Sequence, residues 1–189
     1  MKIVEHHNWI QTSSGQQFYL LVPEPQTILI EDIAHALAHL CRFNGHCREF
    51  YSVAQHSVLV SRHLPLHHRL EGLLHDAAEA YLGDLVHPLK MLPGLEGYRV
   101  LEDRLFRIIA ERFDLKWPMP EEVKQADRAL LQAEARDLMA DPPADFFMGQ
   151  QLPAPFPDPI EPWPPRIARA VFLSDFHALT GNRWRKENM

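Results

Sequence analysis

The segment Leu73–Asp84 constrains the fold most strongly, because it places one histidine and three acids inside an apolar, helix-forming run. The apolar residues of this region recur at the spacing of a helix packed against a core, and they are Leu70, Leu73, Leu74, Ala77, Ala78, Tyr81 and Leu82. Some of the ionisable groups therefore face the interior, where an unpaired carboxylate costs several kcal/mol. Adjacent His75 and Asp76 need either hydrogen-bond partners or a divalent cation, and the doublet alone leaves both alternatives open.

Size and composition limit the class of protein. A chain of 189 residues with 46% hydrophobic content is long enough for one core and short for two, so we expect a single domain over residues 1–189. The net charge of −6, with no basic cluster beyond Arg183–Lys186, argues against nucleic-acid binding. We find no membrane span or signal peptide, and Cys41 and Cys47 suit a reducing compartment, so we expect a soluble, cytoplasmic protein.

The chain is predicted to be all-helical apart from a small N-terminal β-hairpin. Turn residues at 13–15 separate two weakly alternating runs, which indicates strands over 9–12 and 16–20. Apolar periodicity predicts helices over about 31–41, around 53–60, and over 66–82, 100–113, 121–138 and 165–180. The helix over 100–113 carries no chemical group on its apolar stripe, and we interpret it as structural.

A proline-rich connector precedes the last helix. Nine of the sixteen prolines fall between Pro142 and Pro165, which predicts an ordered or semi-rigid segment without regular structure over residues 141–165. Its aromatic residues can pack on the core, and they are Phe146, Phe147, Phe156 and Trp163. The alternative is a proline-rich ligand for an SH3-type domain.

Three separate predicted helices each direct a metal-competent group inward. These groups are His56, His75 with Asp76, and Asp127, which lies four residues from both Val123 and Leu131 in an apolar stripe. Two nitrogen and two oxygen ligands form an open site suited to one divalent ion, of which Co, Mn, Zn, Fe and Mg are candidates. The alternatives are a hydrogen-bonded core histidine at position 56 and an arginine partner for Asp127.

This order of ligands resembles the HD-domain phosphohydrolase superfamily, whose pattern is a His, a His-Asp doublet and a distant Asp, all on helices. Two segments are similar to the bacterial 5'-deoxynucleotidases of the YfbR-like group: His75–Leu85, followed by Pro88 and Lys90, and Val123–Arg128. The resemblance covers roughly residues 31–140. It implies an all-α HD-domain bundle with its catalytic core over about these residues, and a homodimer. It also implies one divalent metal ion held by His56, His75, Asp76 and Asp127.

The resemblance also implies that Glu79 and Asp84 are the catalytic acids. One helical turn separates Glu79 from His75, so its carboxyl group could deprotonate a water molecule or protonate the leaving oxygen. The alternatives are solvation on the helix surface for Glu79 and hydrogen bonding within the following loop for Asp84.

Substrate contacts are expected from two loops. In the resembling group an Arg followed by a Trp contacts phosphate and deoxyribose before the first ligand, whereas here Arg42 is followed by Phe43. This exchange leaves selection against a 2'-hydroxyl open. His87 and Lys90 are further predicted phosphate contacts, with solvated loop charges as the alternative.

The resemblance implies a metal-dependent phosphohydrolase with a small-molecule nucleotide substrate, converting deoxynucleoside 5'-monophosphates to deoxynucleoside and phosphate. Two alternatives are a deoxynucleoside triphosphate triphosphohydrolase on the same scaffold and a catalytically idle nucleotide-binding HD module. Glu79 and Asp84 beside all four ligands argue against the idle module, because a binding module has no need of these acids.

Overall fold

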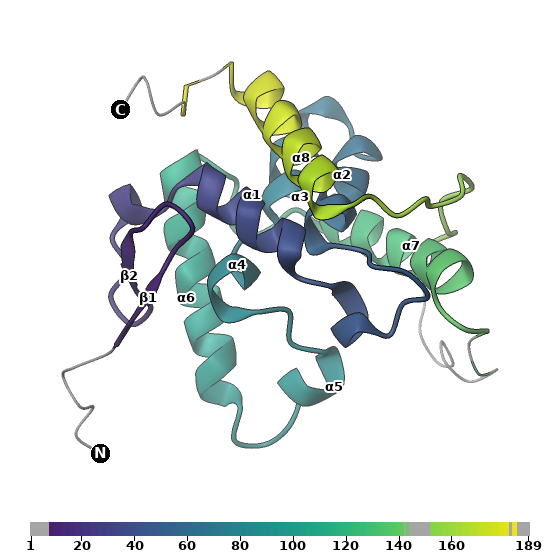
Figure 1. Cartoon of the computed structure of the whole chain (residues 1–189), viewed down its shortest axis with the longest axis horizontal. Coiled ribbons are helices and arrows are strands. Elements are labelled where there is room, and N and C mark those ends of the chain that lie inside the picture. The colour runs from purple at the N-terminus through teal and green to yellow at the C-terminus, as the bar shows by residue number, and fades with distance from the viewer. Residues whose placement is uncertain (1–7, 142, 144–151, 182, 185–189) are drawn as a thin grey trace.

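The computed structural model describes residues 8–141, 143, 152–181 and 183–184, which are mostly helical with a small antiparallel hairpin (Figure 1). The strands are β1 (Trp9–Gln11) and β2 (Gln17–Tyr19). The α-helices are α1 (Ile30–His39), α2 (Val53–Arg62), α3 (Arg69–Leu74), α4 (Glu79–Leu82), α5 (His87–Lys90), α6 (Glu96–Phe113), α7 (Glu121–Leu138) and α8 (Pro165–Thr180). Short 3-10 helices are η1 (Pro25–Thr27), η2 (Arg42–Gly45) and η3 (Leu66–His68). The predicted helical class, the hairpin and the last helix are confirmed.

The hairpin is tied to the first helix and to the core. Phe18 of β2 is fully buried and stacks on Tyr81 with ring centroids 4.0 Å apart. Asp32, in the first turn of α1, accepts hydrogen bonds from the Ser13 hydroxyl at 2.6 Å and the Ser14 amide at 2.7 Å. Burial alone would raise the pKa of Asp32, but these hydrogen bonds hold it below its usual value. The turn between the strands is therefore fixed by a buried carboxylate.

Helix α2 is the central element. It packs against α1, α3, α7 and α8, and nearly all its side chains are buried, as expected of a helix without a solvent-facing side. The Ser52 hydroxyl caps it by accepting a hydrogen bond from the Gln55 amide at 3.2 Å. His56, one turn into this helix, is consequently fully buried and surrounded by other helices.

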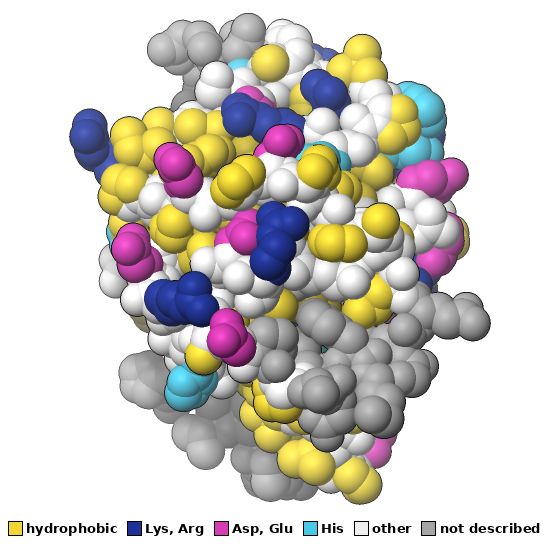
Figure 2. Space-filling view, turned by 90° about the vertical axis from the view of Figure 1, so that its right-hand side faces the viewer, with side chains coloured by type: hydrophobic (Ala, Val, Ile, Leu, Met, Phe, Trp, Pro, Cys, Tyr) yellow, Lys and Arg dark blue, Asp and Glu magenta, His cyan; other side chains and the backbone are white. Residues whose placement is uncertain are grey.

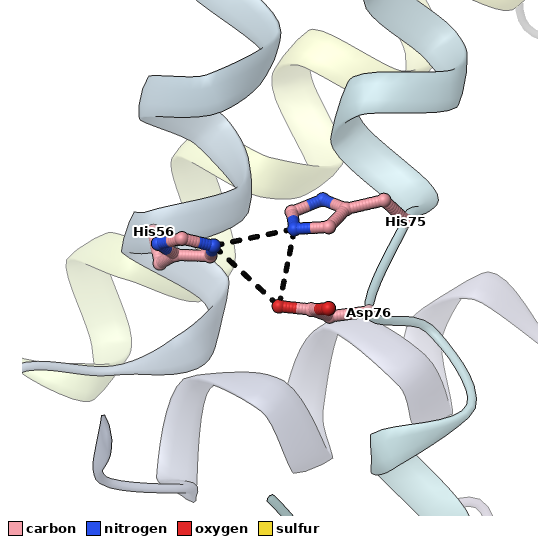
Figure 3. A group of neighbouring side chains, drawn as sticks. All are labelled: His56, His75 and Asp76. Atoms are coloured by element: carbon pink, nitrogen blue, oxygen red, sulfur yellow. Dashed lines mark hydrogen bonds and ion pairs between the residues drawn. The ribbon is translucent and has the colours of Figure 1, made fainter. Parts of the chain in front are cut away.

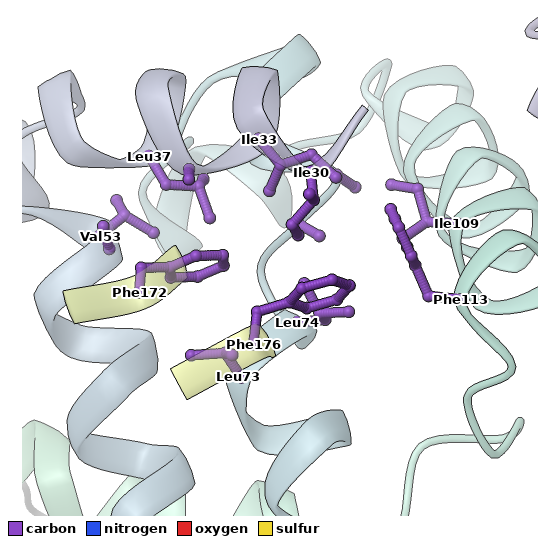
Figure 4. Packing of buried hydrophobic residues seen from close by; sticks show 14 of the residues in the cluster. Ile30, Ile33, Leu37, Val53, Leu73, Leu74, Ile109, Phe113, Phe172 and Phe176 are labelled. Carbon is purple, nitrogen blue, oxygen red and sulfur yellow. The ribbon is translucent and has the colours of Figure 1, made fainter. Parts of the chain in front are cut away.

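The hydrophobic core joins the hairpin, α1, α2, α3, α6 and α8 (Figure 4). Its members that Figure 4 labels are Ile30, Ile33, Leu37, Val53, Leu73, Leu74, Ile109, Phe113, Phe172 and Phe176. Each fully buried side chain of this size contributes about 1.5–3 kcal/mol to folding. Leu73 and Leu74 anchor the end of α3 in this core, so His75, the next residue, leaves the helix beside α2.

The prediction of one continuous helix over 66–82 is wrong. The chain there forms η3, α3 and α4, with residues 75–78 in consecutive turns. In these turns backbone amides bond to carbonyls three residues back, as in the 2.9 Å bond from Ala77 N to Leu74 O. A spacing of three residues is common to this tighter winding and to the α-helix, so apolar periodicity could not distinguish them.

The described part of the proline-rich connector is ordered without regular structure, as predicted. Gln55 of α2 binds its backbone twice, donating to Glu161 O and accepting from Trp163 N, both at 2.7 Å. Phe156 and Trp163 pack against buried clusters. Two other predicted packing residues lie outside the described residues: Phe146 and Phe147.

The surface carries mixed charge on the side that Figure 2 shows. Basic and acidic side chains alternate there among hydrophobic ones, so the described residues on this face form no large field of one sign. In the described part of the chain, every helix falls short of the length and apolar character that crossing a bilayer requires.

Gly72 determines how closely α3 approaches α2. An added Cβ there would collide with Leu64 Cδ1 and lie 3.1 Å from Ser61 Cα. Overpacking lowers the free energy of unfolding by about 1–3 kcal/mol, and the better helix propensity of alanine offsets about 1 kcal/mol of this loss. We expect Gly72→Ala to lower the free energy of unfolding in denaturant titrations by about 1 kcal/mol.

A matched control is Gly97→Ala in α6, where an added Cβ meets nothing within 4 Å. This substitution should stabilise the protein by about 0.5–1 kcal/mol. Equal stabilisation by both substitutions would contradict the close approach of α2 and α3 at Gly72.

Candidate metal centre

Three of the predicted ligands converge on one point (Figure 3). His56 Nε2 lies 3.2 Å from His75 Nε2 and 3.5 Å from Asp76 Oδ2, and His75 Nε2 lies 3.2 Å from Asp76 Oδ2. Two ligand atoms bound to one ion at about 2.0–2.2 Å in tetrahedral geometry lie about 3.3–3.6 Å apart. His56, His75 and Asp76 therefore form a triad that could hold a metal ion.

The fourth predicted ligand lies at the open side of this triad. Asp127 of α7 places Oδ1 3.1 Å from His56 Nε2 and 4.0 Å from His75 Nε2. Its side chain is 41% exposed, whereas that of His56 is fully buried. All four predicted ligands are thus brought together, with Asp127 nearest to solvent.

A backbone contact determines which ring nitrogen of neutral His75 carries the proton. Its Nδ1 lies 2.8 Å from the carbonyl oxygen of Gly72, one turn earlier in α3. A carbonyl oxygen can only accept, so Nδ1 is the donor and the neutral ring has its lone pair on Nε2, the atom that faces the cluster. The end of α3 therefore presents His75 in the form that a metal ion requires.

A buried acid orients His56 in the same way. His56 Nδ1 donates to Glu134 Oε1 at 2.6 Å, and Glu134 Oε2 accepts from Arg42 Nη2 at 3.0 Å. Glu134 is fully buried. A carboxylate bound to the remote nitrogen of a ligating histidine fixes its orientation and raises its basicity.

Sequence reasoning missed Glu134, although a signal existed. Glu134 follows Asp127 by seven residues, or two helical turns, and so shares its face of α7. That face also carries the buried apolar residues Val123 and Leu130.

The carboxylates around the triad favour the protonated forms of His56 and His75. Burial lowers the pKa of both imidazoles, and Arg42 lowers that of His56 further. Yet the nearby carboxylates more than compensate: with Glu134 beside it the pKa of His56 is raised to about 10, and Asp76 raises the pKa of His75. Burial opposes ionisation of Asp76, but His75 holds its pKa well below the usual value. A divalent cation would displace protons on entering, so its binding is coupled to proton release.

A cavity of about 350 Å³ opens beside the cluster, within the range of about 300–1,000 Å³ typical of small-molecule sites. Its described lining comes from the segment after α3 and from α4–α7, and comprises His75, Asp76, Ala78, Glu79, Lys90, Arg99, Glu102, Asp103, Phe106, Trp117, Met119, Val123, Lys124 and Asp127.

Glu79, one of the two predicted catalytic acids, lines this cavity. It is 7% exposed, and its Oε2 has no hydrogen-bond partner among the described residues. Its Oε1 lies 3.6 Å from Lys90 Nζ, which donates to Glu102 Oε1 at 2.7 Å. Burial, together with the charges of Asp76 and Asp84, raises the pKa of Glu79 to about 9. In the metal-free protein this carboxyl group therefore keeps its proton at neutral pH.

Asp84 and His87 are not among the residues that line the cavity. Burial raises the pKa of Asp84, and Asp76 adds to this effect while Arg42 and Lys90 oppose it. His87, at the start of α5, is exposed. Of the two predicted phosphate contacts on α5, only Lys90 lines the cavity, and the roles of Asp84 and His87 stay predictions.

Arg42 and Phe43 are not among the residues that line the cavity. Arg42 is bound to Glu134, with Nη1 3.8 Å from Asp76 Oδ2 and its guanidinium 5.2 Å from the centroid of the Phe43 ring. Phe43 and Asn44 both adopt left-handed backbone angles, with φ of 54° and 51°. That conformation costs about 1–2 kcal/mol per residue. Substrate contacts by Arg42 and Phe43 stay predictions.

The helix over 100–113, interpreted as structural from its apolar stripe, also contributes charged side chains to the cavity. The structure extends it to α6, whose Arg99, Glu102 and Asp103 line the cavity. Three- and four-residue spacing places these charges on one face, but the sequence does not show which neighbour this face meets. Trp117, in the following loop, is a further cavity residue that sequence reasoning did not single out.

Glu134→Gln tests the orientation of His56. The amide preserves shape but removes the charge that pairs with Arg42 and His56, so we expect metal affinity to fall by about 10- to 100-fold. Competition with a chelating dye measures this affinity. Glu122→Gln, an exposed position on the same helix, is the control and should leave affinity unchanged. An unchanged affinity in Glu134→Gln would remove Glu134 from the metal centre.

Two relatives match nearly the whole chain. The protein YfdR of Escherichia coli (strain K12) is 38% identical over 173 residues, which cover 92% of this chain and 96% of the relative. The protein RCAP_rcc00048 of Rhodobacter capsulatus is 37% identical over 193 residues, covering 90% and 95%. Both are described as uncharacterized proteins. No protein-family model matches the chain.

Proposed function

The chain belongs to one family with YfdR and RCAP_rcc00048, and we propose that it is a metal-dependent phosphohydrolase with an HD-domain fold. Its substrates would be deoxynucleoside 5'-monophosphates, which it would hydrolyse to deoxynucleoside and phosphate. The similarity extends over at least nine-tenths of each chain, so the proposal concerns the family as a whole.

The observation that carries the proposal is the way the two histidines are oriented. Each presents Nε2 to the cluster while its Nδ1 is bound elsewhere, to Gly72 O for His75 and to Glu134 for His56. Two imidazole nitrogens and one carboxylate oxygen lie within 3.2–3.5 Å of one another, a spacing that suits three ligands of one divalent ion. These donors fit a divalent ion held by His56, His75, Asp76 and Asp127.

A divalent ion bound there would supply the two functions that phosphate ester hydrolysis needs, a more acidic water molecule and neutralisation of phosphate charge. The protein's own residues would bind the phosphate and transfer the proton. Lys90 and Lys124 line the cavity and attract the phosphate dianion. Glu79, whose Oε2 has no hydrogen-bond partner among the described residues, would donate a proton to the leaving 5'-oxygen or accept one from water.

A screen for phosphate release tests this function. Deoxynucleoside and ribonucleoside mono- and triphosphates are incubated with the protein and Co, Mn, Zn, Fe or Mg, and products are identified by mass. We expect orthophosphate and a deoxynucleoside from the deoxynucleoside 5'-monophosphates with at least one of these metals.

Two other outcomes of the screen would contradict the proposed substrate or the proposed catalytic activity. Release of inorganic triphosphate from deoxynucleoside triphosphates alone would identify the triphosphohydrolase instead. Nucleotide binding without turnover under every metal would identify an idle binding module.

A further inference from the structure

The cavity beside the metal centre has an aromatic wall that the metal chemistry does not use. Trp117, in the loop between α6 and α7, lines the cavity and is 41% exposed. Phe106, Met119 and Val123 line it as well. A large exposed aromatic side chain in a concavity is typical of a binding surface.

On both α6 and α7, an apolar residue that lines the cavity lies one helical turn from an acidic one, on the side of the loop that joins the two helices. On α6, Phe106 follows Glu102 by four residues, and on α7, Val123 precedes Asp127 by four. Four residues correspond to about 6 Å along a helix. In both helices the apolar residue is nearer to the loop over 114–120, which carries Trp117. The cavity therefore has its carboxylate and imidazole ligands at one end and its aromatic and apolar residues at the end near this loop, where Lys124 also lies.

The indole is held in place before any ligand arrives. Its ring lies 5.2 Å from the Phe106 ring at an interplanar angle of 37°, and the Arg107 guanidinium lies 5.7 Å from its centroid. Phe106 itself is buried, so it supports the indole as part of the packed interior. A preorganised ring loses little entropy when a ligand stacks on it.

We propose that Trp117 is the stacking platform for the nucleobase, while the phosphate binds at the metal centre and Lys90. This inference rests on the proposed function and adds to it the part of the site that distinguishes a nucleotide from other phosphate monoesters. Stacking accepts every base, because every base has a π-face, so the protein should hydrolyse several deoxynucleotides at comparable rates. The base-binding aromatic residue then comes from the α6–α7 loop rather than from the Arg42–Phe43 turn.

The test compares ligands with and without a base. Hydrolysis of deoxyadenosine 5'-monophosphate and of 2-deoxyribose 5-phosphate is measured with each of the five metal ions of the screen, and binding of deoxyadenosine by calorimetry. Trp117→Ala should raise KM for the nucleotide and weaken deoxyadenosine binding by about tenfold or more. KM for 2-deoxyribose 5-phosphate should stay within about twofold, because this substrate lacks the stacking group.

Two further variants keep the test specific. Trp117→Phe retains a ring and should preserve most of the affinity for the nucleotide. Tyr19→Ala removes an aromatic residue of similar exposure, 38%, from β2 outside the cavity lining and should change none of the three measurements.

The measurements separate a failure of the proposed role of Trp117 from a failure of the proposed hydrolase function. Deoxyadenosine binding that Trp117→Ala leaves unchanged, or that the wild type lacks, would overturn the role of Trp117. Phosphate release from neither substrate would refute the proposed hydrolase function, while deoxyadenosine binding would still decide whether Trp117 receives a base.

Discussion

Asp76→Ala should abolish stoichiometric metal binding and with it phosphate release. Asp76 is the carboxylate of the triad, with Oδ2 3.2 Å from His75 Nε2 and 3.5 Å from His56 Nε2. Its removal leaves two imidazoles and the partly exposed Asp127, a set with half its negative charge. Metal per chain is measured by elemental analysis after dialysis, and phosphate release under the conditions that activate the wild type.

The control for this loss is Asp141→Ala, whose side chain is fully exposed. It should retain wild-type metal content and activity. A variant lacking Asp76 that stays metal-replete and fully active would refute the metal centre.

Glu79→Gln should retain metal but lower kcat by at least about 100-fold, the usual contribution of a residue in acid–base catalysis. The amide has the shape of the acid but cannot transfer its proton. Metal content and kcat are measured together, with Glu111→Gln, an exposed position on α6, as the control. Unchanged turnover would exclude Glu79 from the chemistry.

The same substitution has a second readout that does not depend on activity. Because burial raises the pKa of Glu79 to about 9, the folded metal-free protein retains a proton that the unfolded chain loses near its ordinary pKa of 4.5. This group therefore makes the metal-free protein progressively less stable as the pH rises from about 4.5 to 9. Glu79→Gln should weaken that decline, so its unfolding midpoint at pH 8 should exceed that of the metal-free wild type.

The three residues of the triad that could hold a metal ion could be singled out from the sequence because burying each of them carries an energetic cost. His56 falls on an apolar helix face, and His75 and Asp76 interrupt an apolar run, so each had to be buried and paired. Nothing local indicated the break after Leu74, because turns with three-residue hydrogen bonds keep the same apolar spacing. The prediction therefore identified the triad residues but assigned His75 and Asp76 to a continuous helix.

Glu134 and Trp117 show what local patterns could not supply. Glu134 is buried only because α2 and α7 pack together and bring His56 and Arg42 to its carboxylate. Trp117 belongs to a loop, where apolar periodicity does not indicate which side chains are buried. Its place in the cavity depends on how α6 and α7 are arranged.

Short segments of the sequence were enough to predict the helical class, the hairpin, the proline and glycine at the two ends of the last helix, and three residues that could hold a metal ion. These predictions follow from backbone preference or from the cost of burying charge, which are properties of short segments. The packing of the helices determines which nitrogen each histidine presents, which acid supports it, and which residues line the cavity beside it. These features depend on distances between residues as far apart in the chain as His56 and Glu134, and such distances arise only when the helices pack.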